Sequence, residues 1–428
     1  MVVVFALVAL LVLAVLVTAN WYVWRRLFRD TTRGPGAARR AGAVLIAGGW
    51  ALAVGALVAE RSGAPFPLQR ILAWPGFLWL ALSVYLLLAL LAGEAVRPLL
   101  RWFLARRDAA RADGARPVAP APAERVPAAT APPAAPAPEP PPASGEAPPR
   151  PAAGPTRRIF VSRVVGGAAA AAAVGTVGHG TYGVLRGPRV KRVTVPLAKL
   201  PRAAHGFRIA VVSDIHLGPV LGRGFAQKVV DTVNSTQADL IAVVGDLVDG
   251  SVKDLGPAAA PLAQLSARHG AFFVTGNHEY FSGAEQWVEE VRRLGLRPLE
   301  NARTELPHFD LAGVNDVAGE DEGQGPDYAR ALGDRDRSRA CVLLAHQPVQ
   351  IHDAVRHGVD LQLSGHTHGG QLWPGSLLAG AANPTVAGLE RYGDTQLYVS
   401  RGAGAWGPPT RVGAPSDITV IELASRQA

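Results

Sequence analysis

Polar residues that could bind metal ions follow five short apolar stretches in the second half of the chain. The motifs are, in order, Ser213-Asp214-Ile215-His216, Gly245-Asp246-Leu247-Val248-Asp249, Gly276-Asn277-His278-Glu279, Ala345-His346-Gln347-Pro348 and Gly365-His366-Thr367-His368-Gly369. Each motif alone is a weak signal, because a single His-x-His or Gly-Asp is usually structural. Five of them in succession leave little room for coincidence. Since α/β sheets build their sites in the loops that follow strands, we expect the five motifs to meet.

The mixture of carboxylate, amide and imidazole side chains predicts a site for two divalent cations. Two cations about 3.5–4 Å apart can clamp a phosphoryl group and activate a water molecule between them. A bridging carboxylate would hold the cations close and offset their repulsion. Imidazole mixed with carboxylate suits Mn, Fe or Zn better than an all-oxygen Ca or Mg site. The chemistry that this pattern indicates is therefore metal-dependent hydrolysis of a phosphate ester.

Short strands alternating with helices must position these motifs. The expected strands cover residues 207–212, 240–244, 271–274, 342–345 and 361–363, and the expected helices cover residues 224–234 and 287–294. This alternation is typical of an α/β domain, which we place at residues 190–428. Cys341, the only cysteine, lies in one of the apolar stretches, so we expect a buried strand residue and no disulfide within the chain.

The order of the motifs resembles that of the calcineurin-like metallophosphoesterase superfamily, over essentially all of residues 190–428. More narrowly, the chain is similar to the bacterial membrane-anchored branch. Two stretches carry this second likeness: Gly365-His366-Thr367-His368-Gly369-Gly370-Gln371, and Tyr398-Val399-Ser400-Arg401-Gly402 through Trp406-Gly407-Pro408-Pro409. The resemblance implies a four-layer α/β/β/α sandwich that binds two divalent metal ions.

The resemblance also implies a role for each matching residue. One metal would be held by Asp214, His216, Asp246 and His368. The other would be held by Asp246, Asn277, His346 and His366, with Asp246 as the bridge. A metal-bound hydroxide would attack phosphorus in line with the leaving oxygen. His278 would contact the phosphoryl group and protonate that oxygen, while Asp249 would orient His278.

Two features bear on the substrate. Gly250 stands where many phosphoprotein phosphatases carry an arginine, which argues against phosphoserine or phosphothreonine as substrate. Arg401 and Arg411, in the late loops, are candidates for binding the substrate, and a structural ion pair is an equally good interpretation of either. The position of Glu279 directly after His278 does not indicate a clear role for this residue.

Apolar segments dominate the N-terminal part of the chain. Three runs, residues 2–24, 41–59 and 71–93, come near the roughly 20 residues that a helix needs to cross a bilayer. They form a predicted membrane region, residues 1–111, which is followed by a Pro/Ala-rich linker at residues 112–155. A Gly/Ala-rich apolar segment, residues 156–185, is the predicted fourth span.

Arginines predict the orientation of these spans. The loop between the first two runs holds Arg25, Arg26, Arg29, Arg33, Arg39 and Arg40, whereas the next loop holds only Arg61 and Arg70. The positive-inside rule then places residues 190–428 outside the cytoplasm, on a multi-pass protein of the cell membrane. The pair Arg157-Arg158 before the fourth span resembles a twin-arginine export signal, and ordinary flanking arginines are the alternative. Both interpretations give the same orientation.

We therefore expect hydrolysis of a phosphomonoester or phosphodiester at the outer membrane face, on a lipid or envelope component. Nucleic acid is not the expected partner, because much of the arginine behind the net charge of +9 flanks membrane segments. A nuclease of the same superfamily is one alternative. A non-catalytic sensing or transport protein is another, but the complete ligand set argues against it. The oligomeric state is left open.

Overall fold

The computed structural model describes residues 2–114 and 156–426. Its contacts divide the chain into two compact units, one of residues 1–44 and 87–171 and the other of residues 45–86 and 172–428. The second unit therefore contains the predicted hydrolytic domain together with parts of the apolar helices. Most of the predicted linker, residues 115–155 of 112–155, lies outside the described residues.

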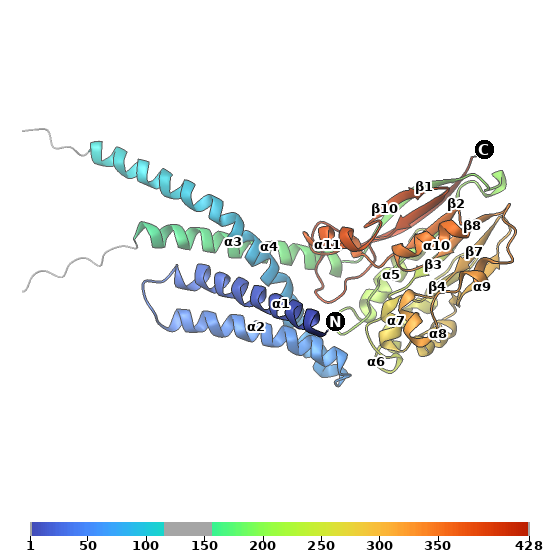
Figure 1. The fold of residues 1–428 in the computed structure, drawn as a ribbon, viewed down its shortest axis with the longest axis horizontal. Coiled ribbons are helices and arrows are strands. Elements are labelled where there is room, and N and C mark those ends of the chain that lie inside the picture. Colours follow the sequence, from blue (N-terminus) through green and yellow to red (C-terminus); the bar gives the residue numbers. More distant parts are fainter. Residues whose placement is uncertain (1, 115–155, 427–428) are drawn as a thin grey trace, which may run out of the picture. The chain divides into compact units, whose positions relative to one another are not determined.

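Four helices are long and apolar enough to cross a membrane (Figure 1). They are α1 (Val2–Trp24), α2 (Ala37–Arg61), α3 (Phe66–Gly114) and α4 (Arg157–Leu185). A short π-helix, η1 (Arg25–Arg29), follows α1. The third helix continues about twenty residues beyond its apolar run, because the Ala, Leu and Arg residues there favour helix as well. The chain thus has the helices of a membrane-associated protein.

The first sheet of the second unit has the strand order β1-β12-β2-β3-β4-β5. Its strands are β1 (Arg189–Leu197), β2 (Phe207–Val212), β3 (Leu240–Val244), β4 (Ala271–Val274), β5 (Arg297–Pro298) and β12 (Asp417–Ser425). Strands β2 to β5 are parallel, and β12 is antiparallel to β2. The carboxyl ends of β2, β3 and β4 therefore meet at one edge, where the first three motifs begin.

The second sheet has the strand order β10-β11-β9-β8-β7-β6. Its strands are β6 (Ala302–Glu305), β7 (Phe309–Gly313), β8 (Ala340–Leu344), β9 (Leu361–Ser364), β10 (Gly388–Tyr392) and β11 (Thr395–Val399). Strands β7, β8, β9 and β11 are parallel to one another. The last two motifs follow β8 and β9, so they too begin at the carboxyl ends of parallel strands.

Helices cover the outer face of each sheet. The helices of this unit are α5 (Arg223–Ser235), α6 (Val252–Ala259), α7 (Asn277–Ser282), α8 (Ala284–Arg293), α9 (Tyr328–Leu332), α10 (Ile351–Arg356) and α11 (Gly375–Ala382). Short 3-10 turns are η2 (Arg202–Ala204), η3 (Ala260–Gln264), η4 (Val317–Glu322), η5 (Pro348–Gln350) and η6 (His368–Gly370).

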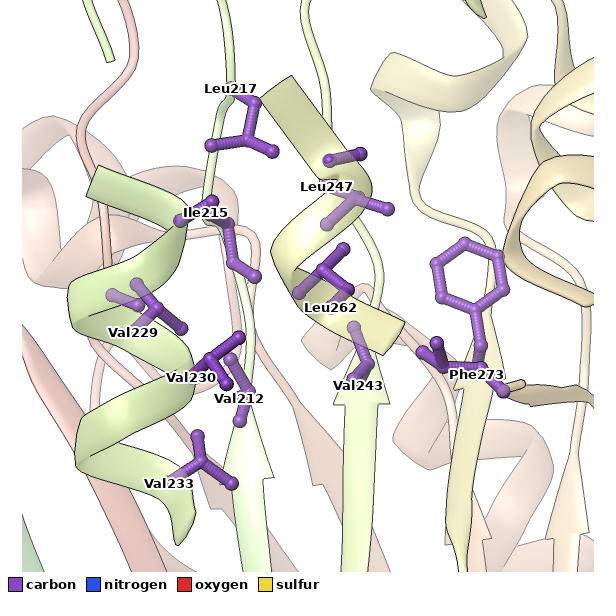
Figure 2. Packing of buried hydrophobic residues seen from close by; sticks show 14 of the residues in the cluster. Val212, Ile215, Leu217, Val229, Val230, Val233, Val243, Leu247, Leu262 and Phe273 are labelled. Atoms are coloured by element: carbon purple, nitrogen blue, oxygen red, sulfur yellow. The ribbon is translucent and has the colours of Figure 1, made fainter. Parts of the chain in front are cut away.

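Three apolar clusters hold these layers together. Ile209 and Val211 of the first sheet pack with Phe309 and Val342 of the second, so the two sheets face each other. The opposite face of the first sheet packs against α5, α6 and α8. Figure 2 shows Val229, Val230 and Val233 of α5 turned toward this face, which follows from their helical spacing. Helices α9 and α10 cover the second sheet in the same way. The predicted four-layer α/β fold is confirmed.

Candidate metal centre

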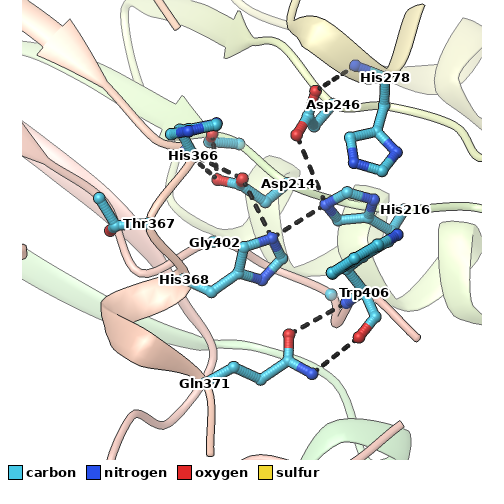
Figure 3. Close-up of polar contacts among 12 residues, drawn as sticks. Asp214, His216, Asp246, His278, His366, Thr367, His368, Gln371, Gly402 and Trp406 are labelled. Atoms are coloured by element: carbon cyan, nitrogen blue, oxygen red, sulfur yellow. Dashed lines mark hydrogen bonds and ion pairs between the residues drawn. The ribbon is translucent and has the colours of Figure 1, made fainter. Parts of the chain in front are cut away.

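The five motifs converge on one cluster of mostly buried side chains. Figure 3 shows Asp214, His216, Asp246, His278, His366 and His368 of this cluster. Asp214 and His216 follow β2, Asp246 and Asp249 follow β3, and Asn277 and His278 begin α7 after β4. His346 follows β8, and His366 and His368 follow β9. Each side chain thus comes from the carboxyl end of a parallel strand. The structure brings together every predicted metal ligand.

The residues expected at the first metal lie close together. The Nε2 atoms of His216 and His368 are 3.0 Å apart, and His368 Nε2 is 3.4 Å from Asp214 Oδ1. The side chains of these three residues are almost completely buried. Their ligand atoms all lie within 4.8 Å of one another, which is close enough for one cation to contact them all.

The residues expected at the second metal form a neighbouring group. Asp246 Oδ2 lies 3.1 Å from His346 Nε2. The Nδ1 atom of His366 lies 2.9 Å from the amide oxygen of Asn277, so this side chain belongs to the same group. Ligand atoms of Asp246, His346 and His366 again lie within 4.8 Å of one another.

Asp246 lies between the two groups. Its Oδ2 atom is 3.7 Å from His216 Nε2 in the first group as well as 3.1 Å from His346 Nε2 in the second. Its Oδ1 atom accepts a hydrogen bond of 2.9 Å from the backbone N–H of His278, which fixes the carboxylate plane. This is the position that a bridging carboxylate requires.

His346 tests whether these residues fit a metal ion. Its Nδ1 lies 2.9 Å from the carbonyl oxygen of Val244, a contact that requires the proton on Nδ1. Its Nε2 is buried and lies 3.1 Å from Asp246 Oδ2, and the charge of Asp246 outweighs burial and raises the pKa of His346 well above its usual value. A metal cation could take the place of the proton between these two groups, and a carbonyl oxygen behind the ring is the usual support of a histidine ligand. The donor set therefore fits a divalent cation.

The charges within the site leave Asp246 and His366 in the forms that bind metal ions. Burial would raise the pKa of Asp246, but the neighbouring His346 and His216 outweigh it and lower that pKa well below its usual value. Burial, together with the charge of His346, lowers the pKa of His366 to about 4. An ionised bridging carboxylate and a neutral imidazole are the forms that coordinate cations.

The backbone at the ligands is strained in a way that the sequence does not reveal. Positive φ angles occur at five of the predicted ligands: Asp214 (52°), His216 (49°), Asp246 (52°), His366 (71°) and His368 (52°). Residues other than glycine rarely adopt this conformation, although Asp and His do so more often than most, and its cost of about 1–3 kcal/mol at each position must be offset by the surrounding structure. Such strain gathers at functional sites, so its concentration on these ligands marks the centre independently of their side chains.

Glycines beside the ligands allow this close packing. A Cβ atom at Gly365 would collide with Ser213 Oγ and the Asp214 carboxylate, and one at Gly276 would collide with Asp246. Because Gly365 has no side chain, the backbone N–H of His366 can approach Asp214 and donate a hydrogen bond of 3.0 Å to its Oδ1 atom. Glycine is thus required where one ligand loop crosses another.

His278 and Asp249 are arranged as a proton donor and its support. Asp249 Oδ1 lies 2.7 Å from His278 Nδ1 and 2.8 Å from His216 Nδ1, so one carboxylate orients two imidazoles. Burial would lower the pKa of His278, but the hydrogen bond and charge of Asp249 outweigh it and raise the pKa to about 9. His278 is less buried than His216 and is flanked by the exposed rings of Phe281 and Trp406, each 5.7 Å away.

Glu279 has a role that its sequence context did not show. Its buried carboxylate accepts hydrogen bonds from the backbone N–H groups of Asp246 (3.0 Å), Leu247 (2.7 Å) and Gly276 (2.6 Å). Glu279 therefore ties the loop after β3 to the loop after β4 and holds Asp246 in place. Its position beside Asn277 and His278 was the only signal in the sequence.

The two arginines proposed for substrate binding differ in position. Arg411 is buried; it donates to the carbonyl oxygen of His368 at 2.9 Å and lies 3.1 Å from His368 Nδ1. These contacts position His368, and they favour a structural role for Arg411 over substrate binding. Arg401 is only partly buried and lies beside Gly369, so its substrate role stays a prediction.

Comparisons with known proteins agree with this geometry. Residues 207–370 match the family model described as calcineurin-like phosphoesterase. The chain is 38% identical over 259 residues to a transmembrane protein with metallophosphoesterase domain from Danio rerio, with 57% of this chain and 59% of that protein covered. A metallophosphoesterase of Helicobacter pylori (strain J99) is 39% identical over 255 residues, with 59% and 68% covered. One from Aquifex aeolicus is 34% identical over 243 residues, with 56% and 92% covered.

The matched region of this chain contains the five motifs, the parallel strands that carry them and the buried ligand cluster. The chain spans only about three fifths of the Danio rerio protein, so this likeness concerns the domain rather than the whole relative. On the sequence match and the site together, the chain belongs to the calcineurin-like phosphoesterase family.

Proposed function

We propose that this protein hydrolyses phosphomonoesters or phosphodiesters at a dinuclear metal site. The observation that carries the proposal is the position of Asp246, whose Oδ2 atom faces His216 of one ligand group and His346 of the other. A single carboxylate between two sets of imidazoles is suited to hold two cations at the spacing that clamps a phosphoryl group. The ligand types favour Mn, Fe or Zn.

The bound cations and the side chains of the site would have separate roles in the reaction. Two bound cations would supply Lewis-acid activation of the phosphoryl group and lower the pKa of a bound water molecule. His278 is held by Asp249 at the more open side of the site, where a substrate oxygen can approach it. The carboxylate of Asp249 favours the protonated imidazole, so His278 can hydrogen-bond the phosphoryl group and give a proton to the leaving oxygen.

We further propose that the site acts at the extracytoplasmic face of the membrane, on a lipid or envelope phosphoester. The four apolar helices associate the chain with the membrane, and the arginines of the first loop support the orientation. A hydrolase held beside lipid meets lipid-linked phosphates at high local concentration.

Metal reconstitution tests the proposed function. The purified full chain, stripped by a chelator, is expected to be inactive and to regain hydrolysis of 4-nitrophenyl phosphate or bis(4-nitrophenyl) phosphate with Mn, Fe or Zn. Because Asp246 shares two ligand groups, active protein should contain two metal ions per chain by elemental analysis. Full activity with one metal ion per chain would overturn the dinuclear mechanism.

Labelling of single cysteines tests the orientation. Cys341 is buried and does not compete, so a membrane-impermeant thiol reagent will report an introduced cysteine. In intact cells, Ser338→Cys on the exposed surface of the domain should react, whereas Ala109→Cys at the end of α3 should react only after lysis. The reverse pattern would place the enzyme in the cytoplasm.

A further inference from the structure

An apolar segment with exposed side chains follows the last ligand, His368, in the chain. It consists of Trp373 and helix α11, and we call it the apolar flap. None of the described residues of α11 is buried. The exposed fractions are 55% at Trp373, 72% at Leu377 and 77% at Leu378. No charged residue occurs in the sequence between His368 and Glu390. Large apolar side chains exposed close together in the sequence point to a site of interaction with a protein or a membrane.

Contacts within the second unit link the flap to apolar helices. The hydroxyl of Tyr85 in α3 donates a hydrogen bond of 3.0 Å to the carbonyl oxygen of Trp373. The backbone N–H of Trp373 donates to Val412, in a loop whose Thr410 hydroxyl lies 2.7 Å from that of Thr181 in α4. Both helices are candidate membrane spans. The start of the flap is therefore joined to helices that are themselves candidates to cross a bilayer.

The same segment is linked to the catalytic side of the centre. The side-chain amide of Gln371, two residues before Trp373, donates to the carbonyl oxygens of Trp406 (2.9 Å) and Pro408 (3.1 Å) and accepts from the Trp406 N–H (3.1 Å). Figure 3 shows these two contacts with Trp406 beside His216 and His368. The Trp406 ring in turn flanks His278. The exposed ring of Trp406 thus lies beside His278, and its backbone is hydrogen-bonded to Gln371, two residues before the flap begins.

We infer that Trp373 and α11 enter the bilayer beside α3 and α4, and that the substrate is the phosphate ester of a membrane lipid. This inference rests on the proposed function and names its substrate class. Trp373 at the start of the flap and Leu377 and Leu378 within α11 are residue types that are typical of segments entering a membrane interface. A lipid whose chains stay in the bilayer would present its headgroup phosphate to the metal centre along Trp406.

Depth measurements test insertion. The full chain carrying Leu378→Cys is labelled with a fluorescent thiol probe and reconstituted into phosphatidylcholine–phosphatidylglycerol vesicles. Lipids with nitroxide-labelled chains should quench this probe, and iodide in the water should not. Val355→Cys, an exposed position on α10, serves as the matched control and should show the opposite pattern. Quenching by iodide at both positions would overturn the inference.

Kinetics test the substrate class. Leu377→Asp combined with Leu378→Asp should lower kcat/KM for phosphatidic acid or phosphatidylglycerol in vesicles about 10-fold or more, because charge opposes entry into the bilayer. Hydrolysis of the 4-nitrophenyl esters should change less than about twofold, since these substrates need no membrane contact. Val355→Asp makes the same change elsewhere on the surface and should leave both reactions unaltered.

The outcomes separate this inference from the proposed function. Wild-type protein that cleaves neither soluble nor lipid esters with any of the metals would refute the proposed function. Wild-type protein that cleaves soluble esters but no lipid ester would refute only the inference. Equal losses on both substrates in the double variant would also refute it. A change in oligomeric state without a change in lipid hydrolysis would identify the flap as a contact between copies of the chain.

Discussion

Asp246→Asn is expected to lower turnover by roughly 10³-fold or more, because metal ions contribute several kcal/mol to the stabilisation of the transition state. The substitution keeps the size of the side chain and its Oδ1 acceptor for the His278 N–H. It removes the negative charge between His216 and His346. Two cations would then repel each other without a shared counter-charge, so the metal content should fall together with activity.

A matched variant makes this result specific. Asp360→Asn is the same chemical change at a carboxylate that precedes β9, whereas the ligands His366 and His368 follow that strand; Asp360 accepts a hydrogen bond from the Cys341 N–H. It should retain two metal ions and nearly normal turnover. If Asp246→Asn kept both metal ions with near-normal turnover, the bridging assignment would be wrong.

His278→Ala should separate catalysis from metal binding. His278 contacts Asp249 and the substrate side of the site, and the other groups can still hold the cations. We therefore expect both metal ions to be retained while turnover falls about 10²–10⁴-fold, the usual contribution of general acid–base catalysis. The loss should be smaller for nitrophenyl esters, because nitrophenolate leaves without a proton, and larger for alkyl phosphodiesters.

The measurement is the ratio of aryl to alkyl ester hydrolysis, with metal content determined on the same samples. His357→Ala is a suitable control, because this partly buried histidine stacks on Tyr328 in another part of the domain. It should leave the ratio unchanged. Equal losses of His278→Ala on both ester types, or the loss of a metal ion, would contradict the role as general acid.

Much of the fold was predictable because it depends on local patterns. The strands at residues 207–212, 240–244 and 271–274 were predicted with the bounds of β2, β3 and β4, since each is a short run of β-branched and aromatic residues between turn residues. Strands β1, β5, β6, β7, β10, β11 and β12 were not predicted. Strands β6 and β10 are partly or largely exposed and rich in charged residues, so they have no apolar pattern of their own, whereas β7 and β11 are buried and were missed all the same.

The ligand residues were also readable from the sequence, because each motif directly follows a strand. The sequence determined which side chains are available and that the parallel strands would deliver them to one edge. It did not determine how they are held. Glu279 acts on Asp246, 33 residues away, and Arg411 acts on His368, 43 residues away. Both contacts exist only because separate loops fold over one another.

Tertiary structure alone decided three further properties. The positive φ angles at the ligands were not predicted, although Asp and His adopt this conformation more often than most residues other than glycine. The grouping of residues 45–86 with the hydrolytic domain depends on long-range contacts, such as that of Tyr85 with Trp373. The exposure of Leu377 and Leu378 is equally a property of the folded chain, because an apolar helix is buried or exposed according to what packs on it. The sequence by itself determined the chemistry of the centre, and the fold decided its geometry and the surface through which substrate can reach it.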